Sequence, residues 1–213
     1  MSDERWADAR RLEAWAGEVR VNLIRAAALL VFYGHHLLVV YVYGGDRSDE
    51  AIVHHAKVTA IALAWMAAVF VLYVCLTRRW VPPGLKYAAT FWDIAMSSAL
   101  LVASPDGPRS PLLYLYFVVL ATSPLRLSLP LVYAATFGVM AAATAVLGHY
   151  VFSQVGREAY YAPDSPYRIA RSSEIIFLLA VGTAGLLAGQ VVRQARRVVR
   201  GYPVVVEEKG ESS

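Results

Sequence analysis

Apolar stretches of similar length recur along the chain, separated by short polar connections. They cover residues 21–43, 57–76, 86–103, 111–129, 131–152 and 174–192. Each is close to the roughly 20 apolar residues that cross a bilayer as a helix. The pattern predicts an all-α integral membrane protein with six transmembrane helices. Pro124 and Arg126 interrupt the fourth stretch, and the count falls to five if that stretch is re-entrant.

Polar segments at both ends divide the chain into three parts. Residues 1–20 carry apolar side chains at helical spacing, which predicts a short amphipathic helix lying on the cytoplasmic face of the membrane. Residues 21–193 form the membrane domain. Residues 194–213 continue the sixth helix into the cytoplasm as an Arg-rich extension and a tail, with Gly201 and Pro203 expected to end the helix.

Composition supports a membrane protein. Hydrophobic residues make up 58% of the chain and charged residues 17%, with a mean hydropathy of +0.47, whereas soluble domains carry about 25% charged residues. A single cysteine excludes a disulfide scaffold. The net charge of +4 is explained by basic residues beside membrane spans. We therefore expect the lipid bilayer, and no nucleic acid, as a partner.

The distribution of Lys and Arg predicts the orientation. With the N-terminus in the cytoplasm, the cytoplasmic segments hold 13 of these residues and the outer loops hold 6. Basic residues concentrate in cytoplasmic loops, so both termini are expected there. Arg25 lies inside the first stretch, near its inner end, and is expected to extend its side chain toward the lipid headgroups.

Asp93 is the first candidate for a functional group. It lies in the third stretch, with Thr90 and Ser97 on the same helical face. A carboxylate inside a membrane is costly, so it should face the bundle and find partners there. Two roles stay open for these three residues: a ligand-binding or signalling group, or a hydrogen-bonded strut between helices.

All five histidines fall in the outer half of the predicted topology, at positions 35, 36, 54, 55 and 149. Such a set could form a pH sensor, a metal or haem site, or a quinone pocket, although histidine is also common at membrane interfaces. No metal-ligand spacing motif is present, so no metal site is predicted. His36 and His149 are the first pair to examine.

Small residues predict close helix packing. Gly185 and Gly189 lie one turn apart in the sixth stretch, and Gly138 lies in the fifth. Stripes of this kind let helix backbones approach each other. They can serve packing within the bundle or a homodimer interface.

The connection between the third and fourth stretches is predicted to be a tight turn. Gly107 supplies flexibility, Ser110 suits a helix N-cap, and Pro111 suits the first helical turn. Aromatic residues surround this turn: Phe91 and Trp92 precede Asp93, and Tyr114 and Tyr116 follow Leu112.

This arrangement resembles the six-helix N-terminal sensor region of bacterial sensor histidine kinases of the redox-responsive and pilus-regulating kind. In those proteins an aromatic helix with an Asp is followed by a Gly-rich turn ending in Ser/Asn-Pro and by a second aromatic helix. The resemblance covers about the middle third of the chain. It implies that Gly107, Ser110 and Pro111 belong to a turn associated with quinone sensing, and it implies a bacterial inner-membrane location.

No P-loop, GxSxG, zinc-type cysteine set or kinase signature occurs in the sequence, so the chain is expected not to be an enzyme. The resemblance implies a sensor module, free-standing or cut from a kinase. It would detect a ligand, redox or pH state and relay it through the sixth helix to a cytoplasmic protein. The alternatives are a haem b- or quinone-associated subunit of a respiratory or photosynthetic complex, and a purely structural assembly subunit.

Overall fold

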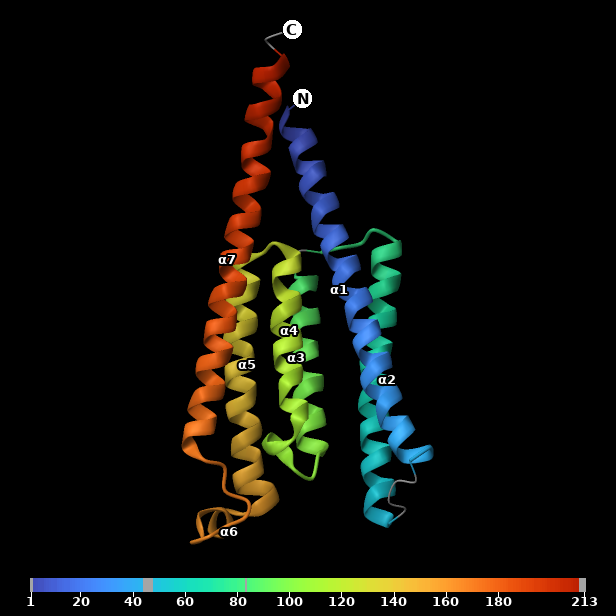
Figure 1. Ribbon diagram of the computed structural model, residues 1–213. Helices are drawn as coiled ribbons and strands as arrows, with labels where there is room; N and C mark the ends of the chain where they lie inside the picture. The colour runs from blue at the N-terminus through green and yellow to red at the C-terminus, as the bar shows by residue number, and fades with distance from the viewer. Residues whose placement is uncertain (1, 44–47, 83, 211–213) are drawn as a thin grey trace.

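The chain folds into a bundle of helices (Figure 1). The computed structural model describes residues 2–43, 48–82 and 84–210, with side chains of residue 12 and, within these ranges, of residues 15–198. No strand occurs among them. The main helices are α1 (Ser2–Tyr41), α2 (Asp49–Thr77), α3 (Leu85–Ala103), α4 (Leu115–Thr122), α5 (Leu129–His149) and α7 (Arg171–Gly210). Short elements connect them: the 3-10 turns η1 (Gly107–Arg109), η2 (Pro111–Tyr114) and η3 (Ser123–Arg126), the π turn η4 (Tyr150–Val155) and α6 (Arg157–Tyr161).

The long helices run side by side, and α1 and α7 extend beyond the others at the same end (Figure 1). We call this end, where both termini lie, the terminal end. We call the opposite end, with α6 and the connection between α1 and α2, the distal end. At the distal end, burial raises the pKa of the Tyr160 phenol, which donates a hydrogen bond to Glu174 at the start of α7 (3.4 Å).

Four helical segments are long and apolar enough to cross a membrane: Trp15–Tyr41, Asp49–Thr77, Leu129–Val155 and Arg171–Val198. They carry many exposed large apolar side chains, which is typical of a helical membrane protein. The predicted third and fourth spans differ from these four. Polar residues occupy part of the buried face of α3, and the helical run Pro111–Arg126 is shorter. The six-span count therefore stays a prediction.

The predicted helix boundaries need correction at both ends of the chain. Residues 2–20 continue α1 without a break, so they do not form a separate helix lying along the membrane surface. The segment has no proline, and its one glycine, Gly17, lies inside the helix against the backbone of Leu125 in η3. At the other end, α7 continues through Gly201 and Pro203 to Gly210, because a proline removes one backbone hydrogen bond while the neighbouring turns keep theirs.

The fourth predicted span ends earlier than expected. After η3 the chain turns at Leu127, which has a left-handed backbone (φ 48°), and α5 begins at Leu129 with Pro130 in its first turn. Pro124 lies in η3 rather than inside an α-helix. The prolines thus shape a short helical run with a tight connection to α5.

The helices form two packing units. The larger core joins α3, α4, α5 and α7, and its fully buried side chains include Leu101, Tyr116 and Val139. We call these four helices the body. A second, smaller cluster joins Leu29 of α1 and Trp65 of α2 to partly buried residues of α3. The α1–α2 hairpin is therefore an outer unit packed against one side of the body.

The predicted small-residue stripes serve packing inside the body. Gly138 of α5 faces Phe91 and Ile94 of α3, and a Cβ there would lie 3.0 Å from the Ile94 side chain. Gly185 of α7 lies against Thr136 of α5, and Gly189 faces Leu129 and Tyr133. Of the two roles left open by the sequence, the structure supports bundle packing.

Replacing Gly185 with Ala is expected to destabilise the bundle by about 1–3 kcal/mol, because the new methyl group overlaps the Thr136 side chain. Gly182, one turn earlier in the same helix, has open space around its Cα. Gly182→Ala is therefore the matched control, with an expected change of less than about 1 kcal/mol. Denaturant unfolding in detergent micelles compares the two variants. Equal stability of both would contradict the close α5–α7 contact.

Candidate functional site

A cavity of about 320 Å³ lies between the hairpin and the body. Its walls come from α1, α2, α3, η2 and α4. Most of the lining is aliphatic, including Leu29, Val58, Leu115 and Val119. The cavity exists because α1 packs on α2 and η3, whereas α4 packs on the body helices α3, α5 and α7.

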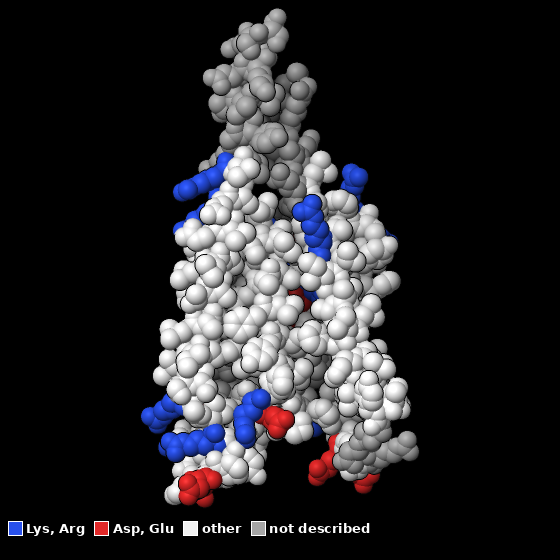
Figure 2. Space-filling view, viewed as in Figure 1, with Lys and Arg blue, Asp and Glu red and all other residues white. Residues whose placement is uncertain are grey.

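The cavity reaches the surface of the bundle. Lining residues on α1 include Ile24, Phe32 and Val39, whose side chains are exposed. Figure 2 shows that the middle of the visible face is largely free of charge, with a small hollow in which acidic and basic atoms are visible. The charged lining residues of the cavity are Arg25 and Asp93.

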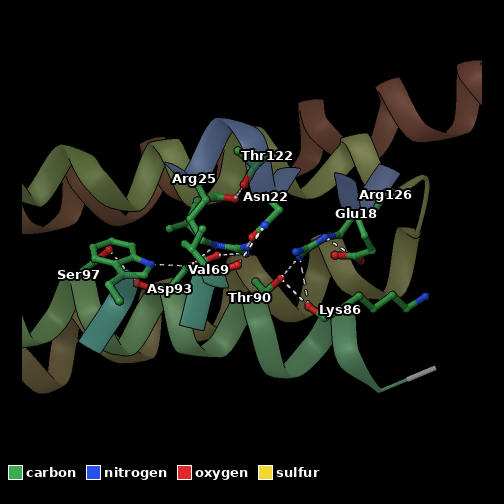
Figure 3. A network of polar contacts seen from close by, with 12 residues as sticks. Glu18, Asn22, Arg25, Val69, Lys86, Thr90, Asp93, Ser97, Thr122 and Arg126 are labelled. Carbon is green, nitrogen blue, oxygen red and sulfur yellow. Dashed lines mark hydrogen bonds and ion pairs between the residues drawn. The ribbon is translucent and has the colours of Figure 1, made fainter. Parts of the chain in front are cut away.

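The wall toward the terminal end holds a buried ion pair. Arg25 of α1 donates from Nε and Nη2 to the two carboxylate oxygens of Asp93 of α3, at 2.7 and 2.6 Å (Figure 3). Trp65 of α2 donates from Nε1 to the same carboxylate at 2.9 Å. Asp93 thus joins three helices, as the cost of a buried carboxylate predicts.

The expectation for Arg25 was wrong. Its side chain is buried, with 5% of the side-chain surface exposed, and does not extend to the headgroups. Arg25 also donates a hydrogen bond from Nη1 to Asn22 Oδ1 at 3.1 Å. Asn22 in turn donates to the Val69 carbonyl oxygen at 3.2 Å. A bidentate partner within reach compensates the charge better than a long path to the lipid surface does.

Thr90 and Ser97 lie on the buried face of α3, but neither lines the cavity. Ser97 Oγ donates to the backbone oxygen of Asp93 at 2.8 Å, and Thr90 Oγ1 donates to the backbone oxygen of Lys86 at 2.8 Å. These bonds occupy both hydroxyl donors within α3. Of the predicted trio, the structure places Asp93 alone at the cavity.

A second buried ion pair lies closer to the terminal end (Figure 3). Arg126 Nε of η3 is 3.0 Å from Glu18 Oε1 of α1, and both side chains are less than 8% exposed. Arg126 Nη1 donates to Thr90 Oγ1 and, at 3.2 Å, to the Lys86 carbonyl oxygen. Arg126 therefore connects η3 to both α1 and α3.

η3 also contacts α7. Arg196 of α7 donates from Nε and Nη2 to the carbonyl oxygen of Leu127, at 3.0 and 2.6 Å. Leu127 directly follows Arg126, which pairs with α1. One short turn thus lies between the first and the last long helix.

Four histidines gather at the distal end of the cavity. His36 Nε2 of α1 is 3.0 Å from His55 Nδ1 of α2, and the two rings stack. The His54 ring lies edge-on to His36, and its Nδ1 is 3.1 Å from the Ala103 carbonyl oxygen. His35, His36 and His54 line the cavity.

The structure does not bring together His36 and His149, the first pair to examine. His149 is exposed at the end of α5, and no contact joins it to the other four histidines among the described residues. The true partner of His36 is His55, which the α1–α2 hairpin brings opposite. Among the described residues, no group of three or more His, Cys, Asp and Glu side chains is arranged to hold a metal ion.

The turn 106–111 closes the distal end of the body and does not line the cavity. Ser110 caps η2 by accepting from the Leu112 backbone N–H, and Pro111 follows in the first turn. Gly107 has φ 51°, and a Cβ there would lie 2.5 Å from the Tyr150 ring. The turn has the predicted local structure: Ser110 and Pro111 start η2, and Gly107 lies against Tyr150 of η4.

Comparisons with protein-family models, with curated proteins and with solved structures found no match. The resemblance to sensor-kinase input regions therefore stays a prediction. Sequence reasoning missed the Glu18–Arg126 pair and the contribution of His55 to the cluster. Glu18 and Arg126 each lie near the end of an apolar stretch, where a charged residue is ordinary, so their pairing has no local signal.

Proposed function

We propose that the chain is a non-enzymatic membrane sensor module, which binds a small lipid-soluble ligand in the cavity and relays occupancy through α7. The main support for this proposal is the cavity between the hairpin and the body. A gap between two packing units, open toward hydrocarbon and lined by an ion pair, is a typical place for a ligand that alters their contact.

The cavity chemistry favours an uncharged ligand. Its volume of about 320 Å³ is at the lower end of the usual range for small-molecule sites. Arg25 and Asp93 neutralise each other, so the wall offers no net charge to an ion. Tyr33, His36 and His54 line the distal side and can hydrogen-bond a carbonyl or hydroxyl group. A quinone has this chemistry, and the resemblance implies one.

η3 supports the proposed relay. A ligand that changes the position of α1 relative to the body acts on Glu18 and thereby on Arg126. Leu127 passes this displacement to Arg196 of α7. α7 extends beyond the body at the terminal end (Figure 1). A cytoplasmic partner bound to this extension would respond to the displacement of α7. The predicted tail for that partner falls on residues whose side chains lie outside the described ones.

The proposal includes the predicted six spans in a bacterial inner membrane with both termini in the cytoplasm. α3 and the run Pro111–Arg126 would cross inside the bundle, where neighbouring helices cover their polar groups. The exposed basic residues Arg78, Arg79, Arg193 and Arg197 near the terminal end support this orientation.

Filling the cavity tests ligand binding. Ala28→Leu adds bulk to the lining, and Ala27→Leu adds it to an exposed neighbour on the same helix. We expect Ala28→Leu to weaken binding of a short-chain benzoquinone to the protein in nanodiscs at least about tenfold, with no change for Ala27→Leu, as measured by calorimetry. Equal affinities, or no binding by the unsubstituted protein, would count against a quinone. A Soret band in the purified protein would instead favour a haem-associated subunit.

A further inference from the structure

The distal half of α1 has few polar attachments. Among the described residues, the side-chain hydrogen bonds of this half all run to α2. Tyr33 bonds to Thr59 at 3.2 Å, His36 to His55 at 3.0 Å, and Tyr41 to His55 at 3.3 Å. Two of these three contacts use the His55 ring. The other half of α1 is attached separately, through the Arg25–Asp93 and Glu18–Arg126 pairs.

The His36–His55 contact depends on protonation. Two ring nitrogens 3.0 Å apart form a hydrogen bond if one nitrogen carries a proton and the other accepts it. This condition holds when both rings are neutral, and also when one of them is cationic. When both rings are cationic, two N–H groups face each other and the contact is lost. The second proton binds beside a ring that is already cationic, so this state needs a lower pH than protonation of a single ring.

The groups around the pair oppose additional positive charge. His35 and Tyr33 on α1 and His54 on α2 lie beside the pair, and Tyr41 bonds to His55. α3 presents Leu100 and the Ala103 carbonyl oxygen, and η2 presents Leu112. His54 also lines a second groove, whose charged residues are Asp49, Glu50 and Lys57. No described carboxylate bonds to either ring, so a doubly cationic pair has no counter-ion in contact.

We propose that the His36–His55 pair is a proton-operated latch that closes the cavity by holding the distal half of α1 on α2. The latch regulates the ligand site and to that extent rests on the proposed function. Acidification on the distal side breaks the His36–His55 contact and places two cationic rings side by side, while the Tyr41 oxygen can still accept from the His55 ring. Phe32 and Val39 then move away with α1 and widen the cavity, while Tyr33 and the ion pairs keep the rest of α1 in place.

Distance measurements between spin labels test the latch without any added ligand. Leu38 of α1 and Ile52 of α2 are exposed and line neither the cavity nor the groove. Both become cysteine for labelling in a Cys75→Ala background. In nanodiscs, the distance between the labels is expected to lengthen by about 5 Å, comparable to a one-turn helix displacement, between about pH 7.5 and about pH 4.5.

Variants separate the latch from general effects of acid. The double variant His36→Gln/His55→Gln keeps an amide hydrogen bond that does not titrate, and we expect it to stay closed at both pH values. His149→Gln removes a histidine at the same end but outside the cluster, and should leave the lengthening unchanged. If the double variant fails to fold, the pH dependence of the label distance in the protein that keeps both histidines still tests the latch.

Three results would overturn the latch: a constant distance in the labelled protein, the same lengthening in the double glutamine variant, or its loss in His149→Gln. None of them depends on a ligand. Failure of quinone binding with an intact pH response would reject the proposed ligand and keep the latch. Ligand binding without a pH response would reject the latch and keep the proposed ligand.

Discussion

Asp93→Asn is expected to destabilise the protein by about 3–5 kcal/mol, because it leaves the Arg25 guanidinium charged and unpaired inside the bundle. The asparagine side chain has nearly the same shape, so packing around it is kept. It offers a neutral oxygen where Arg25 and Trp65 now bond to a carboxylate. The loss therefore reports the charge and not a cavity.

Denaturant unfolding in detergent, followed by far-ultraviolet circular dichroism, measures this loss. Asp106→Asn is the matched control, since Asp106 is exposed at the distal turn, and its expected change is within about 0.5 kcal/mol. The double variant Arg25→Met/Asp93→Leu removes both charges and should recover most of the stability. A loss below about 1 kcal/mol for Asp93→Asn would show that the ion pair does not hold the hairpin on the body.

The position of Asp93 could be predicted from the sequence, but its partner could not. A carboxylate in an apolar helix has to face the bundle, because lipid tails supply no hydrogen-bond donor or positive charge for it. Arg25 had two ways to satisfy its charge, since a long side chain can also reach the headgroups. The choice depends on how close α1 lies to α3 at that level. That distance is set by contacts far away in the sequence, such as Gly17 against η3.

The histidines show the same limit. Apolar run lengths place them at one end of the bundle, as predicted. Which rings meet depends on the register of the α1–α2 hairpin, because His35 and His36 point in directions about 100° apart. Residues 44–47 of the connection lie outside the described residues. Local structure was easier to predict than contacts between helices. Ser110 caps η2 with Pro111 in its first turn, as the turn sequence predicts.

Helix ends were the weakest part of the sequence prediction. Hydropathy detects where apolar residues stop, and α1 and α7 continue as helices beyond that point. A helix leaving the membrane keeps its own backbone hydrogen bonds, so polarity alone does not end it. The continuation is relevant to function, because Glu18 and Arg196 lie near or beyond the predicted limits of the first and last spans.

Arg126→Met is expected to destabilise the protein by about 3–5 kcal/mol, because the buried Glu18 carboxylate loses its charged partner. Methionine keeps much of the length of the side chain, so the change is mainly one of charge. Arg20→Met is the control, since Arg20 is exposed on α1, with an expected change within about 0.5 kcal/mol. A double-mutant cycle with Glu18→Gln isolates the pair, and a coupling energy near zero would contradict the buried ion pair.

The same variant separates detection from relay. The His36–His55 contact lies at the distal end and does not involve η3, so Arg126→Met should keep the acid-dependent distance between α1 and α2. With labels on the exposed residues Val19 of α1 and Val191 of α7, we expect a ligand-dependent change in the unsubstituted protein and none in Arg126→Met. The reason is that η3 no longer transmits a displacement of Glu18 to Leu127 and Arg196. A change that persists in the variant would show that the signal reaches α7 by another path through the body.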